Sequence, residues 1–169
     1  MLSAGVLAGV IIGVVLSLAW LVYISATPDM PVLGRVQGTQ AFRSVAAHPD
    51  VETYPGLLIV RFDAGLFFAS SDALGDGLRR LAQDAEPPYE VIVISFEGID
   101  FIDSQGSATF AQILQLATTY GIDVRIARVK PAVLDVLRRD GVADRLGADH
   151  IYPNLYEAVS DRVEPGDAH

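Results

Sequence analysis

The chain contains no cysteine, and basic side chains are scarce in it. Without cysteine, a disulfide scaffold, a cysteine-ligated zinc site and a thiol nucleophile are all excluded. Twelve lysines and arginines stand against 21 aspartates and glutamates, which gives a formal net charge of −9. That balance argues against a nucleic-acid partner, because such proteins need a basic face to neutralise phosphates. The 169 residues suit one ordinary domain with an additional segment.

Charge of either sign is also missing from the start of the chain. No ionisable side chain precedes Asp29, and the first basic residue is Arg35. As a helix, the uncharged run Leu2–Ile24 would be about 34 Å long, enough to cross a hydrocarbon core of about 30 Å. Trp20 and Tyr23 stand near its end, where aromatic rings favour the headgroup level. We therefore predict a transmembrane helix at residues 1–27.

A secretory signal peptide is the alternative for this run. It fits poorly, because no basic segment precedes the apolar residues and the run exceeds the usual length of about 7–15 residues. The sequence Ile24-Ser25-Ala26 is only a loose match to a cleavage signal. The membrane helix is therefore the preferred interpretation.

Three glycines, Gly5, Gly9 and Gly13, recur every four residues within the predicted helix. They share one helical face, and small residues on such a face let another helix approach closely. Glycine is also simply common in membrane helices, so this packing role is one of two interpretations. If it holds, the helix packs against helices that this sequence does not contain.

Beyond the helix, residues 28–56 are rich in proline and glycine and predict a juxtamembrane connector with a first strand at Val32–Val36. From residue 57 onward, strand and helix patterns alternate, which requires crossover connections and a mostly parallel sheet. We predict an α/β domain at residues 57–164 and a disordered tail at 165–169. Apolar runs predict strands at Leu57–Phe62, Leu66–Ala69, Val91–Phe96, Ile122–Ala127 and Ile151–Tyr152. Apolar residues at helical spacing predict a helix from Ser70 or Ser71 to Ala85, one that starts at Ser104 and is closed by Gly121, one that starts at Pro131 and ends at Gly141, and one from Leu155 to Val163.

Sequence signatures of enzyme chemistry are missing. The chain has no phosphate-binding P-loop, no G-x-G-x-x-G and no H-E-x-x-H. His48, His150 and His169 are isolated from one another, so we expect no metal site. Glu97, Asp100 and Asp103 cluster in one loop, but no glycine elbow or charge partner accompanies them in the sequence. We therefore expect neither an enzyme nor a cofactor.

The start of the helix at Ser104 is the most informative position. Asp103 or Ser104 would cap the exposed N–H groups there, and those groups with the helix dipole favour an anion. Asp103, Ser104, Gln105 and Gly106 are thus the candidate interaction surface or anion site. A phosphate on Ser104 would gain from the dipole but would crowd against Asp103 and Asp100. A regulatory phosphorylation site and an ordinary helix cap both remain open at this point.

The segment Phe101–Gly106 resembles the D-S-x-G signature of STAS domains, which include bacterial anti-sigma-factor antagonists that are phosphorylated at the place of Ser104. Much of the remaining chain is similar to the C-terminal part of bacterial SulP anion transporters, from the last membrane helix through the STAS domain. Gly65 departs from the proline usual there, and Ser70-Ser71 from the common Asn-Ala. The similar stretches are Leu33–Val36 through Arg43, His48-Pro49, Pro55–Leu58, Arg61–Ala64, Leu66–Ala69, Ala127–Lys130 and Asn154–Val159.

The resemblance implies an α/β, STAS-like mixed sheet with flanking helices, preceded by a single transmembrane helix. It further implies a cytoplasmic regulatory domain of a secondary transporter of sulfate, bicarbonate or a related anion, in the inner or plasma membrane. The implied partners are the membrane, the transporter's remaining helices, a second copy in a homodimer and a regulatory protein. One helix cannot enclose a polar path through hydrocarbon, so we expect no transport by this chain alone.

Two other functions stay open alongside the transporter interpretation. One is a membrane-tethered phospho-switch, similar to an anti-sigma-factor antagonist, that acts through Ser104. The other is a nucleotide-binding regulatory module, as has been suggested for some STAS domains, although the chain has no phosphate loop.

Overall fold

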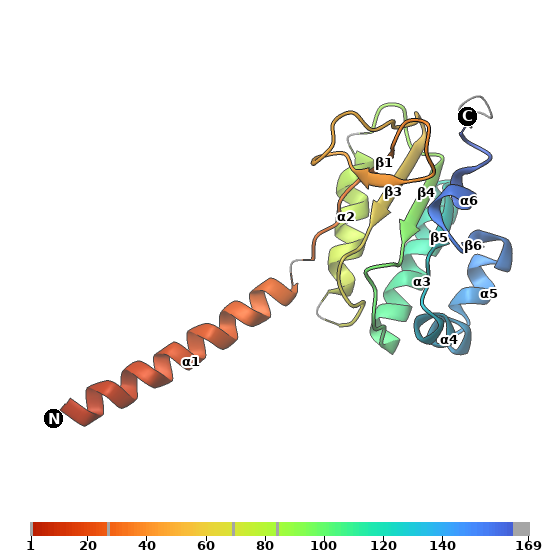
Figure 1. Ribbon diagram of the computed structural model, residues 1–169. Helices are drawn as coiled ribbons and strands as arrows, with labels where there is room; N and C mark the ends of the chain where they lie inside the picture. Colours follow the sequence, from red (N-terminus) through yellow and green to blue (C-terminus); the bar gives the residue numbers. More distant parts are fainter. Residues whose placement is uncertain (1, 27, 69, 84, 164–169) are drawn as a thin grey trace.

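A long helix leads the chain into an α/β domain, as Figure 1 shows. The computed structural model describes residues 2–26, 28–68, 70–83 and 85–163. The predicted tail at 165–169 and the side chain of Tyr23 lie outside this described part.

Helix α1 (Leu2–Ala26) is 25 residues long and projects away from the domain. The helical prediction for this segment is confirmed. Its described apolar side chains are exposed on all sides, with Val6 65% and Leu16 64% accessible. Among the described residues, none forms a helix that is both long and apolar enough to span a membrane.

The central sheet consists of four parallel strands in the order β3 (Leu57–Arg61), β4 (Val91–Ser95), β5 (Asp123–Ala127) and β6 (Ile151–Tyr152). The predicted parallel sheet is thereby confirmed. Every residue of β4 is buried, because the strand is central and both of its faces are covered. An isolated antiparallel bridge between Val32 and Val60 makes the arrangement mixed.

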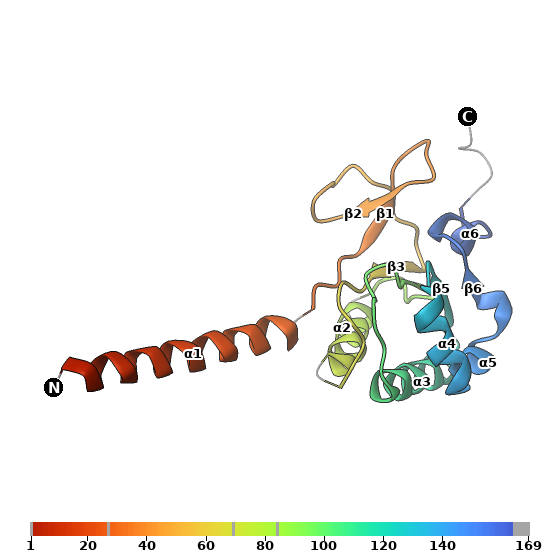
Figure 2. The same ribbon diagram turned by 60° about the horizontal axis from the view of Figure 1, so that its bottom comes forward.

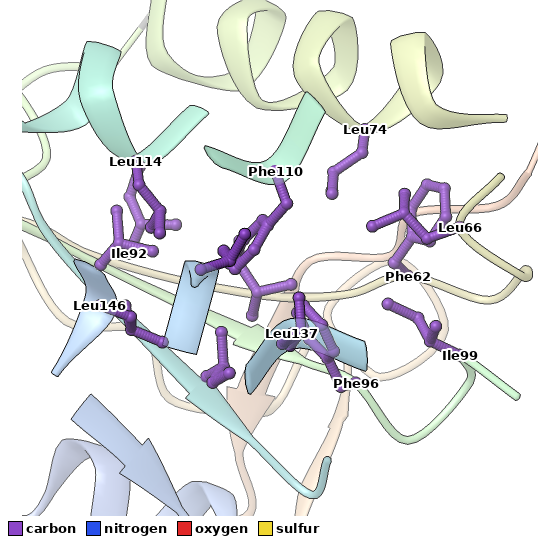
Figure 3. Close-up of a cluster of buried hydrophobic side chains, with 14 of the residues drawn as sticks. Phe62, Leu66, Leu74, Ile92, Phe96, Ile99, Phe110, Leu114, Leu137 and Leu146 are labelled. Carbon is purple, nitrogen blue, oxygen red and sulfur yellow. The ribbon is translucent and has the colours of Figure 1, made fainter. Parts of the chain in front are cut away.

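Two hydrophobic cores lie on the two faces of this sheet. On one face, Leu58 and Val60 belong to a core shared with helices α2 (Ser71–Gln83), α3 (Ser104–Thr119), α4 (Pro131–Arg139) and α5 (Val142–Leu146). Figure 3 shows Leu74 and Phe110 reaching toward Phe62 and Phe96 in that core. On the other face, Leu57 and Ile59 pack with β1 (Leu33–Arg35) and α6 (Leu155–Val159). The remaining elements are β2 (Phe42–Ser44), which pairs antiparallel with β1, and the 3₁₀ helix η1 (Ala148–His150).

Several predicted boundaries were wrong for local physical reasons. The strand expected at Leu66–Ala69 is a single bridge from Leu66 to Ile102 followed by a turn, and Ala69 lies outside the described residues. The hydroxyl of Ser70 donates to the carbonyl of Gly65 at 2.5 Å and so holds this turn. Helix α2 ends at Gln83 rather than Ala85, ahead of two prolines.

The C-terminal part also differs from the prediction in its short elements. Helix α6 ends at Val159, although Val163 beyond it is still buried. Strand β2 and helix α5 were missed, because elements of three and five residues carry too little periodicity to recognise.

Buried Arg125 on β5 ties the sheet to the C-terminal helix. It donates two hydrogen bonds to the carboxylate of Asp161, at 2.5 and 2.8 Å, and one to Asp123 at 2.8 Å. A further hydrogen bond reaches the Ala158 carbonyl at 2.7 Å. Its hydrogen bonds to Asp161 raise the pKa of Arg125, and in turn they lower the pKa of Asp161.

Helix α1 joins the domain at the carboxyl ends of the parallel strands. The N–H of Asp63 donates to the carbonyl of Asp29 at 3.1 Å, and Val32 pairs with Val60 in the antiparallel sense. The segment after α1 therefore runs backward along β3 and starts beside the strand's end. We call this end of the sheet, with the loops after β3, β4 and β5, the carboxyl edge. Figure 2 shows these loops and the first turns of the helices that follow them.

Candidate functional site

Helix α3 begins at the carboxyl edge with a side-chain cap from Asp103. This residue has extended backbone angles, φ −102° and ψ 176°, as an N-cap requires. One carboxylate oxygen accepts from the N–H of Gly106 at 2.7 Å, and the other accepts from the N–H of Phe68 at 3.2 Å. Asp103, not Ser104, is thus the cap, and it also fastens the loop after β3 to the helix.

Ser104 and Gln105 form the first turn of α3 with exposed side chains, while Gly106 is buried. A Cβ at Gly106 would lie 2.1 Å from the carbonyl oxygen of Leu66, inside any tolerated contact. Glycine is therefore required at this position. The D-S-x-G spacing has a geometric basis here, because its aspartate caps the helix and its glycine lets the neighbouring loop approach.

Two cations from the loop after β5 stand beside the acidic loop. Arg128 donates to Glu97 at 3.0 Å, and Lys130 forms an ion pair with Asp100. The sequence prediction gave these carboxylates no charge partner, which was wrong. The partners lie about thirty residues further along the chain and meet the carboxylates only because β4 and β5 are adjacent.

Two phenylalanines on this edge were not anticipated. Phe68 is 74% exposed and Phe101 is 59% exposed, whereas most other aromatic rings of the domain are partly or fully buried. Their loops are joined directly, because the N–H of Leu66 donates to the carbonyl of Phe101 at 2.8 Å. The site thus presents exposed rings next to Ser104 and Gln105.

The histidines have structural surroundings where the structure describes them. His150 lies between Asp123 at 3.0 Å and Asp149 at 3.1 Å, and His48 contacts Arg43 at 3.3 Å. His169 lies outside the described residues. Within the described ranges, no three histidine or acidic side chains gather in a way that could hold a metal ion.

Gly5, Gly9 and Gly13 are exposed on α1. No heavy atom of the described chain lies within 4 Å of a Cβ built at any of them, apart from neighbouring residues and the helix backbone. Their role in helix packing therefore stays a prediction.

Comparison with known proteins places this arrangement in a family. The model of the STAS domain matches residues 48–158, and the chain belongs to that family. Its relatives are transporters of the SulP and SLC26 type. "Probable sulfate transporter 4.2" of Arabidopsis thaliana is 32% identical over 165 residues, covering 92% of this chain and 24% of the relative. A probable sulfate transporter of Mycobacterium tuberculosis (strain CDC 1551 / Oshkosh) is 30% identical over 158 residues, covering 94% of this chain and 28% of the relative.

Solved structures show the same fold. The murine Slc26a9 anion transporter in its inward-facing state aligns with a TM-score of 0.79 and 18% identity, over 92% of this chain and 25% of that one. The SulP transporter STAS domain from Vibrio cholerae aligns with a TM-score of 0.54 and 20% identity, over 69% and 88% respectively. The chain spans about a quarter of the length of the curated relatives it matches. These relatives favour the transporter interpretation over the phospho-switch and nucleotide-binding alternatives.

Proposed function

We propose that this chain is the C-terminal part of a SulP-type anion transporter, with α1 as its last membrane helix and the STAS domain as a cytoplasmic regulatory module. The observation that carries the proposal is the extent of the structural likeness. The alignment with the whole murine transporter covers 92% of the chain, more than the residues after α1 amount to. The alignment with the isolated bacterial STAS domain covers only 69%.

The surface of α1 supports a membrane location. Its described side chains from residue 5 to residue 21 are exposed and none of them is charged. Apolar surface in water is unfavourable by about 25 cal/mol per Å², and soluble monomers rarely expose continuous apolar patches larger than a few hundred Å². In the hydrocarbon core of a membrane the same apolar surface does not have this unfavourable free energy. Gly5, Gly9 and Gly13 then provide a face for neighbouring membrane helices, where dispersion contacts hold the pair.

The domain itself acts by docking rather than by transport. The substrate of the assembled protein is sulfate, bicarbonate or a related anion, and the names of the relatives support sulfate within this class. Anion-binding groups would lie in other membrane helices, because one helix cannot line a polar path. The assembled transporter is a homodimer in the inner or plasma membrane. Its STAS domain adjusts the activity through contacts at the carboxyl edge.

The membrane location can be tested by flotation with liposomes on a density gradient. We expect the chain to float, because α1 inserts into the bilayer. The variant Ile11→Lys/Val15→Lys should stay at the bottom, since each charge at the centre of a membrane helix is unfavourable by about 2.5–3.5 kcal/mol. The matched variant Ile11→Leu/Val15→Leu should float like the parent. A parent chain that remains at the bottom would refute the assignment of α1.

The second test concerns transport by the chain alone. We expect radiolabelled sulfate uptake into vesicles containing only this chain to equal uptake into empty vesicles. The measured quantity is the initial rate of uptake under an imposed sulfate gradient. Uptake above that of empty vesicles would show that α1 and the STAS domain suffice, and would overturn the proposed division of labour.

A further inference from the structure

The exposed part of the carboxyl edge combines rings and negative charge on the side of the domain where α1 ends. Phe68 and Phe101 supply the rings, and their loops are joined by hydrogen bonds to each other and to Asp103. Asp29, the third residue after α1, is bonded to Asp63 at the start of one of these loops. The apolar pair therefore belongs to the edge of the domain at which the chain enters from α1.

The charge balance of this edge identifies the kind of partner. Arg61, Arg128 and Lys130 are each already paired with a carboxylate. Three acids remain in excess, and in the described part of the chain neither Asp29 nor Asp72 forms an ion pair. The six carboxylates that stand in the loops of this edge, in the chain beside β3 or in the first turn of α2 are Asp29, Asp63, Asp72, Glu97, Asp100 and Asp103.

We propose that the carboxyl edge, through Phe68 and Phe101, docks onto a lysine- and arginine-bearing cytoplasmic loop of the membrane domain to which α1 belongs. The inference rests on the proposed function. Cytoplasmic loops of membrane proteins carry an excess of lysine and arginine, which complements the excess of acids here. An anionic lipid surface would instead be repelled by the same acids. Exposed aromatic rings supply the desolvated centre that docking surfaces use.

Photo-crosslinking in the complete gene product, in its native membrane, tests this docking. Phe101 is replaced by benzoylphenylalanine, and linked peptides are identified by mass spectrometry after irradiation. The matched control places the same residue at Tyr120, which is 72% exposed but caps the opposite end of α3. We expect residue 101 to link to a peptide of a cytoplasmic loop that contains lysine or arginine, with at least about threefold more product than residue 120.

The contribution of charge to this docking is tested by how the crosslinking yield depends on salt. Raising the salt from 0.1 to 1 M shortens the screening length from about 10 to about 3 Å, so the yield at residue 101 should fall at least about twofold. Asp72→Asn should lower that yield, whereas Asp50→Asn, an exposed acid in the connector, should not. A salt-independent yield would overturn the charge complementarity.

The outcomes separate the two proposals. Links from residue 101 only to lipid, only to another STAS domain, or no more often than from residue 120 overturn the docking inference. If the protein is membrane-embedded in that experiment, the proposed function stands while the docking fails. A protein absent from the membrane fraction removes the proposed function itself. A melting temperature equal to that of the parent confirms that the substituted chain is folded.

Discussion

Removing the guanidinium of Arg125 should be one of the most damaging single changes in the domain. Its side chain is only 10% exposed and joins β5 to Asp161, Asp123 and the Ala158 carbonyl. Breaking a buried ion pair from one side is destabilising by about 3–5 kcal/mol when the remaining charge stays buried. Here the remaining carboxylates are 53% and 32% exposed and can be rehydrated. We therefore expect Arg125→Met to lower the free energy of unfolding by about 2–3 kcal/mol.

Removing the charge of Asp161 should destabilise the domain less than removing the guanidinium of Arg125. Asp161→Asn leaves Arg125 with Asp123 and the Ala158 carbonyl, so the buried cation keeps two partners. A loss of about 1 kcal/mol is expected, as for a single charged hydrogen bond with an exposed partner. Scanning calorimetry of the full chain in detergent measures both, and a loss of about 2–3 kcal/mol corresponds to a fall in melting temperature of roughly 10 °C.

The pH dependence provides an independent check on the same pair. The hydrogen bonds from Arg125 lower the pKa of Asp161 in the folded state, below the value of about 3.9 in the unfolded chain. A group with a depressed folded pKa stabilises fully above its unfolded pKa, and this stabilisation is lost as the pH falls through the folded pKa. The difference in stability between the parent and Asp161→Asn should therefore be constant from pH 8 to about 5 and shrink below about pH 4.

Two results would refute this reasoning. One is an Arg125→Met variant as stable as the parent, which would mean that the buried cation makes no net contribution to the free energy of unfolding. The other is a larger loss from Asp161→Asn than from Arg125→Met, because the exposed carboxylate would then matter more than the buried guanidinium.

Substitutions at three positions test the candidate site, all by urea unfolding. Gly106→Ala should lower stability by about 2–4 kcal/mol, because its Cβ would overlap the Leu66 carbonyl, whereas Gly75→Ala, with 3.9 Å of clearance in α2, should raise it by about 0.5–1 kcal/mol. Asp103→Ala should lower stability by about 1–2 kcal/mol, and Asp103→Asn by less, since an amide oxygen still caps α3. Arg128, at φ 60°, should tolerate glycine without loss but not valine, which is β-branched; equal losses for both would contradict the strain at this residue.

The sheet could be predicted from the sequence because its signals are local. The continuous apolar run at Val91–Ser95 indicates a strand covered on both faces, and β4 is buried throughout. The helical spacing of Phe110 and Leu114 indicates which face of α3 is buried, and both side chains lie in the core. Such patterns need only the two side-chain periodicities of helix and strand. They say nothing about which loops meet at the end of a sheet.

Which residues gather at the carboxyl edge could be predicted only from the order of the strands in the sheet. Strand β4 pairs with β5 so that Ser95 lies opposite Ala127. Glu97 and Arg128 follow these two residues and therefore meet, although no spacing in the sequence marks them as partners. The exposure of Phe101, which stands between Asp100 and Ile102, had no signal in the sequence, because phenylalanine is more often buried.

The backbone of Arg128 connects local strain with the proposed docking. A non-glycine residue at φ 60° is disfavoured by roughly 1–2 kcal/mol, and its exposed pair with Glu97 returns at most about 1 kcal/mol. Folding alone would favour glycine at this position. Arg128 keeps Glu97 in place at the carboxyl edge, where Lys130 also pairs with Asp100. Strain of this kind concentrates where a surface has a task beyond stability, which supports the assignment of this edge as the domain's point of contact.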